Sequence, residues 1–78
     1  MKPEINLSQL KEGESCIIKR LEMNGDMRCR LSELGFISGT KIICLQKSFS
    51  GDPTAYFVKG AVIALRKADT SKIKIAVP

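Results

Sequence analysis

The chain has 78 residues, of which 44% are hydrophobic and 27% charged, and its 13 Lys and Arg against 8 Asp and Glu give a formal charge of +5. This composition is typical of one small globular domain over residues 1–78 rather than of a disordered chain, and it leaves no room for a deep active site. No run of ~18 apolar residues is present, and the first residues lack the apolar segment of a secretory signal, so we expect a soluble cytoplasmic protein.

The first half of the chain predicts a helical turn, a strand and a short helix. Residues 6–10 have the small polar side chains that cap a single helical turn. Residues 15–23 read as a strand, but their alternation is imperfect and leaves its core face open. Over residues 27–34 the apolar period changes to steps of four and three, as on one side of a helix. We expect Leu31 and Leu34 of that helix in the core.

The second half is predicted to be mostly strand, because its segments are rich in β-branched and aromatic residues: 40–47, 54–59, 61–66 and 73–77. The loop 48–53 is dense in turn-forming residues, and residues 68–72 favour one more helical turn. The chain would then have about five strands, with one short helix inserted after the first. This pattern indicates a mainly β fold, a small, partly open barrel in which closure hides most sheet edges.

The inventory of reactive side chains argues against catalysis. The chain has no His, which is the commonest general base and metal ligand. It also lacks a phosphate-binding glycine loop of the Gly-x-x-x-x-Gly-Lys-Ser/Thr type and any Cys-x-x-Cys pair. We therefore predict no enzyme activity, no catalytic residues and no cofactor.

The three cysteines, Cys16, Cys29 and Cys44, stand at wide and irregular intervals. The simpler interpretation is three small buried or half-buried apolar side chains in a reducing compartment. The alternative is a thiolate metal site built from all three, with Asp52 as a further ligand. Their spacing does not support that site, so no metal ligands are predicted.

Four stretches of the sequence form a recognisable series: Leu7-Ser-Gln-Leu-Lys-Glu-Gly13, Arg28-Cys-Arg-Leu-Ser-Glu-Leu-Gly35 continuing through Ser38-Gly39-Thr40, Gly51-Asp52-Pro53, and Val62-Ile-Ala-Leu-Arg66. In this order they resemble the FeoA family, small SH3-like accessory proteins of bacterial ferrous iron uptake. The resemblance implies a cytoplasmic, non-enzymatic protein that acts on the membrane iron permease FeoB, whose cytoplasmic portion is a G-protein-like GTPase domain. The pattern is also similar to the C-terminal SH3-like domain of iron-dependent repressors, so the fold follows more directly than the role.

The first candidate surface for binding a partner is the helix with its flanks. Met27 either packs inward or forms a contact surface. Arg28 and Arg30 either belong to a solvated face or dock to an acidic surface or a nucleotide phosphate.

The second candidate surface is the loop between the strands 40–47 and 54–59. Turn chemistry alone explains the triplet Gly51, Asp52 and Pro53. Phe49 is an aromatic residue in an otherwise polar loop, and it suits either a partner contact or a packing role under the loop.

Two other functions compete with the adaptor role. A small basic barrel that binds nucleic acid is one, but only Phe49 and one of Tyr56 or Phe57 are plausible stacking platforms, so no nucleic acid is expected. A metal-binding or regulatory SH3-like module is the other. The membrane is expected to be reached only through the partner, and an open sheet edge would allow a homo-oligomer.

Overall fold

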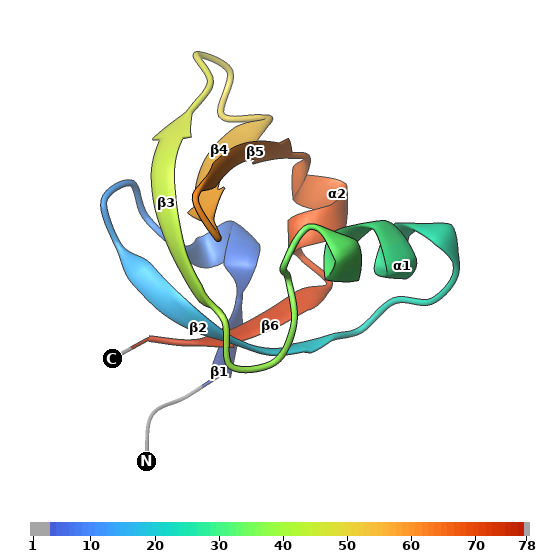
Figure 1. The fold of residues 1–78 in the computed structure, drawn as a ribbon. Helices are drawn as coiled ribbons and strands as arrows, with labels where there is room; N and C mark the ends of the chain where they lie inside the picture. The colour runs from blue at the N-terminus through green and yellow to red at the C-terminus, as the bar shows by residue number, and fades with distance from the viewer. Residues whose placement is uncertain (1–3, 78) are drawn as a thin grey trace.

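The structure, a computed structural model, describes residues 4–77 and shows one antiparallel sheet curved into a partly open barrel (Figure 1). The strands lie in the order β1-β6-β2-β3-β4-β5, so β1 and β5 form its two edges. The strand bounds are β1 Glu4–Asn6, β2 Ser15–Leu21, β3 Lys41–Lys47, β4 Thr54–Val58, β5 Ala61–Leu65 and β6 Ile73–Ala76. The helical segments are η1 Leu7–Gln9, α1 Asp26–Glu33 and α2 Lys67–Thr70. None of the helices in this part of the chain is long and apolar enough to cross a membrane.

The predicted mainly β, partly open barrel with one short inserted helix is confirmed, but the sheet has six strands instead of about five. The additional strand is β1, which pairs with β6 through Glu4 and Ala76, Ile5 and Ile75, and Asn6 and Lys74. Three residues are too few to show an alternating pattern, so this strand gives no signal in the sequence.

A β-bulge explains the imperfect alternation of β2. Its pairing with β6 shifts register between Ile18 and Arg20. Cys16 and Ile18 are buried, as alternation requires, and the extra residue then returns Leu21 to the core. A bulge inserts one residue opposite a partner strand and so changes which side chains face inward beyond it. The core face of β2 therefore depends on a tertiary register that the sequence alone does not reveal.

The core is one cluster to which nearly every element contributes. η1 and the residue after it supply Leu7 and Leu10, and Leu31 enters from α1. The strands supply most of the rest: Cys16, Ile18, Leu21, Ile42, Cys44, Tyr56, Val58, Leu65, Ile73 and Ile75. Leu34, expected in the core, is instead 37% exposed. Leu34 stands at the C-cap of α1, and within that helix only Leu31 is buried, since a core this small has room for few side chains.

The end of α1 makes a close approach to the turn between β4 and β5. Gly35 has φ of +108°, and a Cβ placed there would lie 2.7 Å from Cγ of Lys59 and 3.3 Å from Cγ2 of Val58. Directly after it, the Phe36 N–H donates to the Leu31 carbonyl at 2.9 Å. Glycine satisfies both the left-handed backbone and the short contact, which lets Phe36 turn into the core.

We expect Gly35→Ala to lower the free energy of unfolding by about 2 kcal/mol, because a Cβ adds both backbone strain and a steric overlap. Gly13→Ala is the matched control, since Gly13 also has a positive φ but a Cβ added there would have no neighbouring atom within 4 Å. Urea denaturation of both variants measures the difference. Equal losses would show that the contact with Lys59 and Val58 does not constrain the fold.

Candidate functional site

Two of the three candidate residues on α1 are engaged within the molecule. Met27 is half-buried and packs against the core cluster. Nη1 of Arg28 donates to the carbonyl oxygens of Leu21 at 2.7 Å and Met23 at 3.3 Å, which ties α1 to the end of β2. Arg30 is exposed. Arg28 therefore has a structural contact that the sequence did not indicate, and of the three side chains Arg30 extends most freely from this helix.

The loop between β3 and β4 carries one exposed aromatic residue, and one of its side chains holds the loop to the start of α2. Phe49 is fully exposed, so the interpretation that it packs under the loop is wrong. Oδ1 of Asp52 accepts a hydrogen bond from the backbone N–H of Lys67 at 2.9 Å, and so holds the start of α2. Gly51 has φ of +90°, and the Pro53 carbonyl accepts the Ser48 N–H at 3.0 Å. Turn chemistry therefore accounts for Gly51, whereas the Asp52 side chain makes a long-range contact with α2 that the sequence did not indicate.

The two sets of candidate residues do not meet. In Figure 1, α1 lies at the right of the barrel, whereas the β3–β4 loop projects at the top beyond the ends of those strands. Met27, Arg28 and Arg30 thus belong to one part of the surface, and the residues 49–53 belong to another. They do not form a single site.

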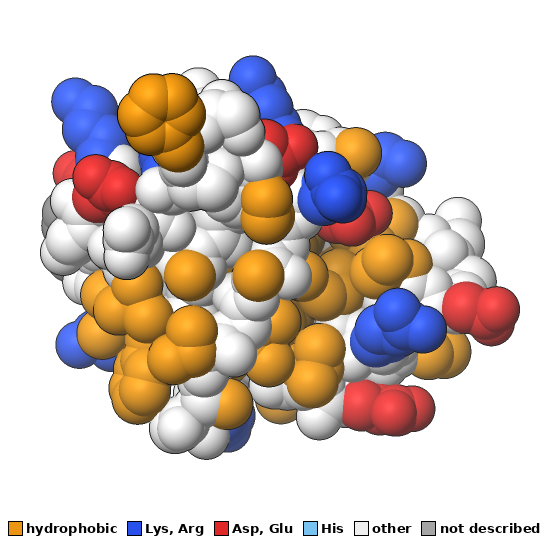
Figure 2. All heavy atoms as spheres, turned by 90° about the horizontal axis from the view of Figure 1, so that it is seen from above, with side chains coloured by type: hydrophobic (Ala, Val, Ile, Leu, Met, Phe, Trp, Pro, Cys, Tyr) orange, Lys and Arg blue, Asp and Glu red, His pale blue; other side chains and the backbone are white. Residues whose placement is uncertain are grey.

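A third surface, which the sequence reasoning missed, is the outward face of β3, β4 and β5. The strand pairing aligns Ile43 with Phe57 and Phe57 with Val62, and it aligns Ala55 with Ala64. Val62 is 65% exposed and Phe57 38% exposed. We name these five residues the outer apolar face. On the side of the molecule that Figure 2 shows, hydrophobic side chains gather in a broad area with many of the charged side chains around it.

The outer apolar face ends at an unprotected sheet edge. β5 is the edge strand, and its sequence, Ala61-Val-Ile-Ala-Leu65, contains neither a charge nor a proline. Edge strands that must stay unpaired usually carry Lys, Pro or a bulge that prevents another strand from joining. An apolar face beside an unblocked edge is instead typical of a binding surface, because a partner can cover the side chains and pair with the backbone.

A shallow hollow joins this face to the β3–β4 loop. It has a volume of about 240 Å³, and its walls include Ala55, Ala64 and the predicted site residue Pro53, together with Gln46, Lys47 and Ser48. Pro53 is thus the one residue of the predicted triplet that borders the outer apolar face. The sequence did carry a signal for this surface, since β4 and β5 are apolar at consecutive positions and a thin core cannot bury both faces.

The three cysteines do not form one cluster. Cys16 and Cys44 are buried, whereas Cys29 on α1 is exposed, so the expectation that all three are at least half-buried is wrong for Cys29. Within residues 4–77, no group of three or more Cys, Asp or Glu side chains is placed to hold a metal ion. The alternative of a thiolate site made from all three cysteines and Asp52 is therefore not formed. Burial raises the pKa of the Cys16 thiol to about 12, with the nearby Cys44 adding to the effect.

Comparison with known proteins identifies a family. The model for the FeoA domain matches residues 5–77. A curated relative, the Fe(2+) transport protein A/Fe(2+) transporter FeoB fusion protein of Porphyromonas gingivalis, is 34% identical over 71 residues. The match covers 91% of this chain but only 8% of that relative, so the chain spans a small part of the fusion protein's length.

Solved structures support the same conclusion. The solution structure of iron(II) transport protein A from Clostridium thermocellum has a TM-score of 0.89 and 34% identity, and covers 94% of this chain and 45% of that one. Stenotrophomonas maltophilia FeoA in complex with zinc has a TM-score of 0.82 and 25% identity, with 91% and 88% coverage. It is described as a prokaryotic SH3 domain protein and a candidate activating factor of ferrous iron transport. The SH3-like fold class is thereby confirmed.

The hydrogen bonds of Arg28 predict that replacing it destabilises the protein more than replacing Arg30 on the same helix. We expect Arg28→Gln to lower the free energy of unfolding by about 1 kcal/mol, because it removes hydrogen bonds from a charged donor to two carbonyls. Arg30→Gln should change stability by less than about 0.5 kcal/mol, as surface substitutions usually do. Thermal or urea denaturation measures both, and a reversed order would contradict the structural assignment of Arg28.

Because Cys16 is buried, we expect the free energy of unfolding to fall at alkaline pH. Its pKa rises from an ordinary 9.0 to about 12, so above pH 9 the unfolded chain gives up this proton before the folded chain does. The free energy of unfolding should fall as the pH rises through that window, because the unfolded state binds fewer protons. Tyr56, whose pKa is raised from 10.0 to about 12 chiefly by burial, acts in the same direction.

Cys16→Ala should flatten this dependence when urea denaturation is repeated across the alkaline window, because the titrating thiol is gone. Cys29→Ala, which removes an exposed thiol, is the control and should leave the slope unchanged. A slope that is the same in wild type and Cys16→Ala would show that this thiol is not shielded from water.

Proposed function

The chain belongs to the FeoA family, and on this premise we propose that it is a cytoplasmic accessory protein of bacterial ferrous iron uptake that binds the cytoplasmic GTPase portion of a FeoB-type permease. The observation that carries the proposal is the Porphyromonas gingivalis relative, in which an A protein and a FeoB transporter are parts of one chain. Such a fusion keeps its two parts at high local concentration, which favours direct contact between their separate counterparts.

We further propose that the outer apolar face is the contact with this partner. Phe57 and Val62 are large apolar side chains on adjacent strands, and both are substantially exposed without serving the core. Binding energy at protein interfaces is concentrated in a few central side chains of this kind, surrounded by polar residues. The free backbone groups along β5 add a second means of attachment, because a strand of the partner can extend the sheet.

The residues proposed from the sequence take different parts in this contact. Phe49 is exposed and Pro53 lines the hollow next to the outer apolar face, so both are suited to the periphery of the interface. Gly51 and Asp52 shape the loop that carries them. On α1, Arg30 is suited to an electrostatic contact with an acidic surface, while Met27 and Arg28 position the helix.

Recognition of this kind needs no catalytic group, in agreement with the side-chain inventory. Of the aromatic residues considered as stacking platforms for nucleic acid, Tyr56 is only 2% exposed and is unavailable, whereas Phe49 and Phe57 are exposed. Phe57 is available for stacking, but its neighbours Ile43 and Val62 are apolar, and nucleic-acid interfaces are rich in positive charge.

The proposal predicts that Val62→Glu weakens binding to the purified cytoplasmic domain of the organism's FeoB-type permease by at least about tenfold, because it buries a charge at the centre of the contact. Phe57→Glu should have a similar effect. Isothermal titration calorimetry, in the presence and in the absence of guanine nucleotide, measures the affinities.

Ser38→Glu is the control, since Ser38 is exposed in the turn after α1 and the substitution adds the same charge away from the outer apolar face. Denaturation curves establish that each variant is folded. Unchanged affinity in both Val62→Glu and Phe57→Glu would exclude the outer apolar face, and the absence of binding by the wild type in every nucleotide state would exclude the partner.

A further inference from the structure

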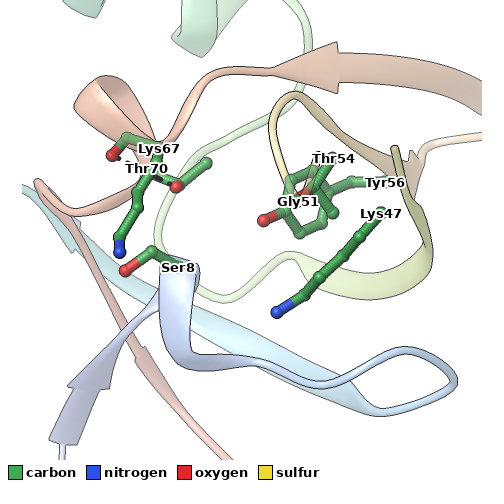
Figure 3. A pocket seen from close by; sticks show the side chains of 7 residues that line it. All are labelled: Ser8, Lys47, Gly51, Thr54, Tyr56, Lys67 and Thr70. Carbon is green, nitrogen blue, oxygen red and sulfur yellow. Dashed lines mark hydrogen bonds between the residues drawn. The ribbon is translucent and has the colours of Figure 1, made fainter. Parts of the chain in front are cut away.

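A second, polar pocket lies among η1, the adjoining ends of β3 and β4, and α2 (Figure 3). Its volume is about 90 Å³, whereas one water molecule needs only ~10–15 Å³, so it has room for a small polyatomic ligand. Gly51 is one of the residues that line it, and the others carry two ammonium groups and four hydroxyl groups: Lys47, Lys67, Ser8, Thr54, Tyr56 and Thr70.

The two lysines bring positive charge to the pocket, and no carboxylate is among the residues that line it. Figure 3 shows their side chains extending toward the pocket from different elements, Lys47 from the end of β3 and Lys67 from the start of α2. Neither forms an ion pair with a described residue, whereas the ion pairs in that part of the chain involve Arg20 and Lys74. Two ammonium groups that face a common space repel each other, and an anion between them removes that repulsion.

Two carboxylates lie near the lysines of the pocket, and each accepts a hydrogen bond from a backbone N–H. Oε2 of Glu12 accepts the N–H of Lys47 at 2.7 Å, and Oδ1 of Asp52 accepts the N–H of Lys67 at 2.9 Å. They fix the backbone from which each lysine extends. Within residues 4–77, neither carboxylate forms an ion pair with the ammonium group of Lys47 or Lys67.

The hydroxyl groups supply donors in several directions. Tyr56 is almost fully buried, and burial together with the nearby Cys44 raises the pKa of its phenol to about 12, so it keeps its proton at neutral pH. The hydroxyls of Thr54 and Thr70 also line the pocket, and the Thr70 hydroxyl donates to the Lys67 carbonyl at 3.4 Å. The Ser8 hydroxyl donates to Oδ1 of Asn6, and a hydroxyl hydrogen can rotate to a new acceptor when one enters.

We propose that this pocket binds a tetrahedral oxyanion of the phosphate type, either free or as the phosphate group of a small monoester. Two cationic groups match the charge of a phosphate dianion, and hydroxyl donors placed around the space match an acceptor whose oxygens point in four directions. A planar carboxylate or a halide would leave part of this donor set unused. The pocket is separate from the outer apolar face, so the proposal stands independently of the partner.

Titration of the ¹⁵N-labelled protein with inorganic phosphate, at ionic strength held constant with sodium chloride, tests the proposal. We expect saturable chemical-shift changes at the backbone amides of Ser8, Lys67 and Thr70. Lys47→Gln and Lys67→Gln should each weaken binding roughly tenfold, since each removes one charge-assisted hydrogen bond. Lys41→Gln removes an exposed lysine on β3 outside the pocket and should have no effect.

Titrations with three other anions test which property of the ligand the pocket recognises. If tetrahedral geometry and charge determine the affinity, sulfate should shift the same amide signals as phosphate, and acetate should bind more weakly. O-phosphoserine distinguishes the two sources, since its binding at the same amides shows that a monoester is admitted, and its failure restricts the site to the free anion. The amide spectra of the lysine variants, unchanged away from the pocket, establish that they are folded.

The proposal is overturned if phosphate produces no saturable shifts beyond those of sodium chloride. It is also overturned if the shifts persist unchanged in both Lys47→Gln and Lys67→Gln, or if Lys41→Gln weakens them equally, because binding would then follow the overall positive charge. None of these outcomes bears on the affinity for FeoB, which is measured with variants of other residues.

Discussion

The central constraint on this protein is that one curved sheet must supply almost the whole of a very small core. Only the inward side chains of each strand can be buried, and two β-bulges decide which those are. The shift between Ile18 and Arg20 returns Leu21 to the core, and the shift between Cys44 and Gln46 changes which side chains at the end of β3 face inward. Apolar residues on the other side of the strands have no core to enter. The outer apolar face follows directly from this geometry.

The same constraint explains why the fold could be predicted from the sequence more fully than the site. β-branched residues and turn formers are local signals, and they located β3, β4, β5 and α1 to within a residue or two. Pairing is not a local signal. The three residues of β1 become a strand only because β6 lies beside them, and the buried side of β2 depends on a bulge.

The candidate site residues show the same division between local and long-range effects. The sequence placed Arg28 on a helix and Asp52 in a turn-forming loop, but the groups they bind, the Leu21 carbonyl and the Lys67 amide, are brought near only by the fold. Conversely, the sequence does not distinguish Phe57 and Val62 from other strand residues, and only the strand register shows that they lie side by side on the outward face. Lys47 lines both the polar pocket and the hollow beside the outer apolar face, but it is not one of the five residues that form that face.

The most direct test of the account is amide hydrogen exchange of this protein alone and with the cytoplasmic domain of the FeoB-type permease. If the partner covers the outer apolar face, the outward amides of β5 should exchange markedly more slowly in the complex, because an edge strand gains both cover and hydrogen-bond acceptors. Slower exchange confined to α1, with β5 unchanged, would contradict the account and show that the partner binds the helix instead.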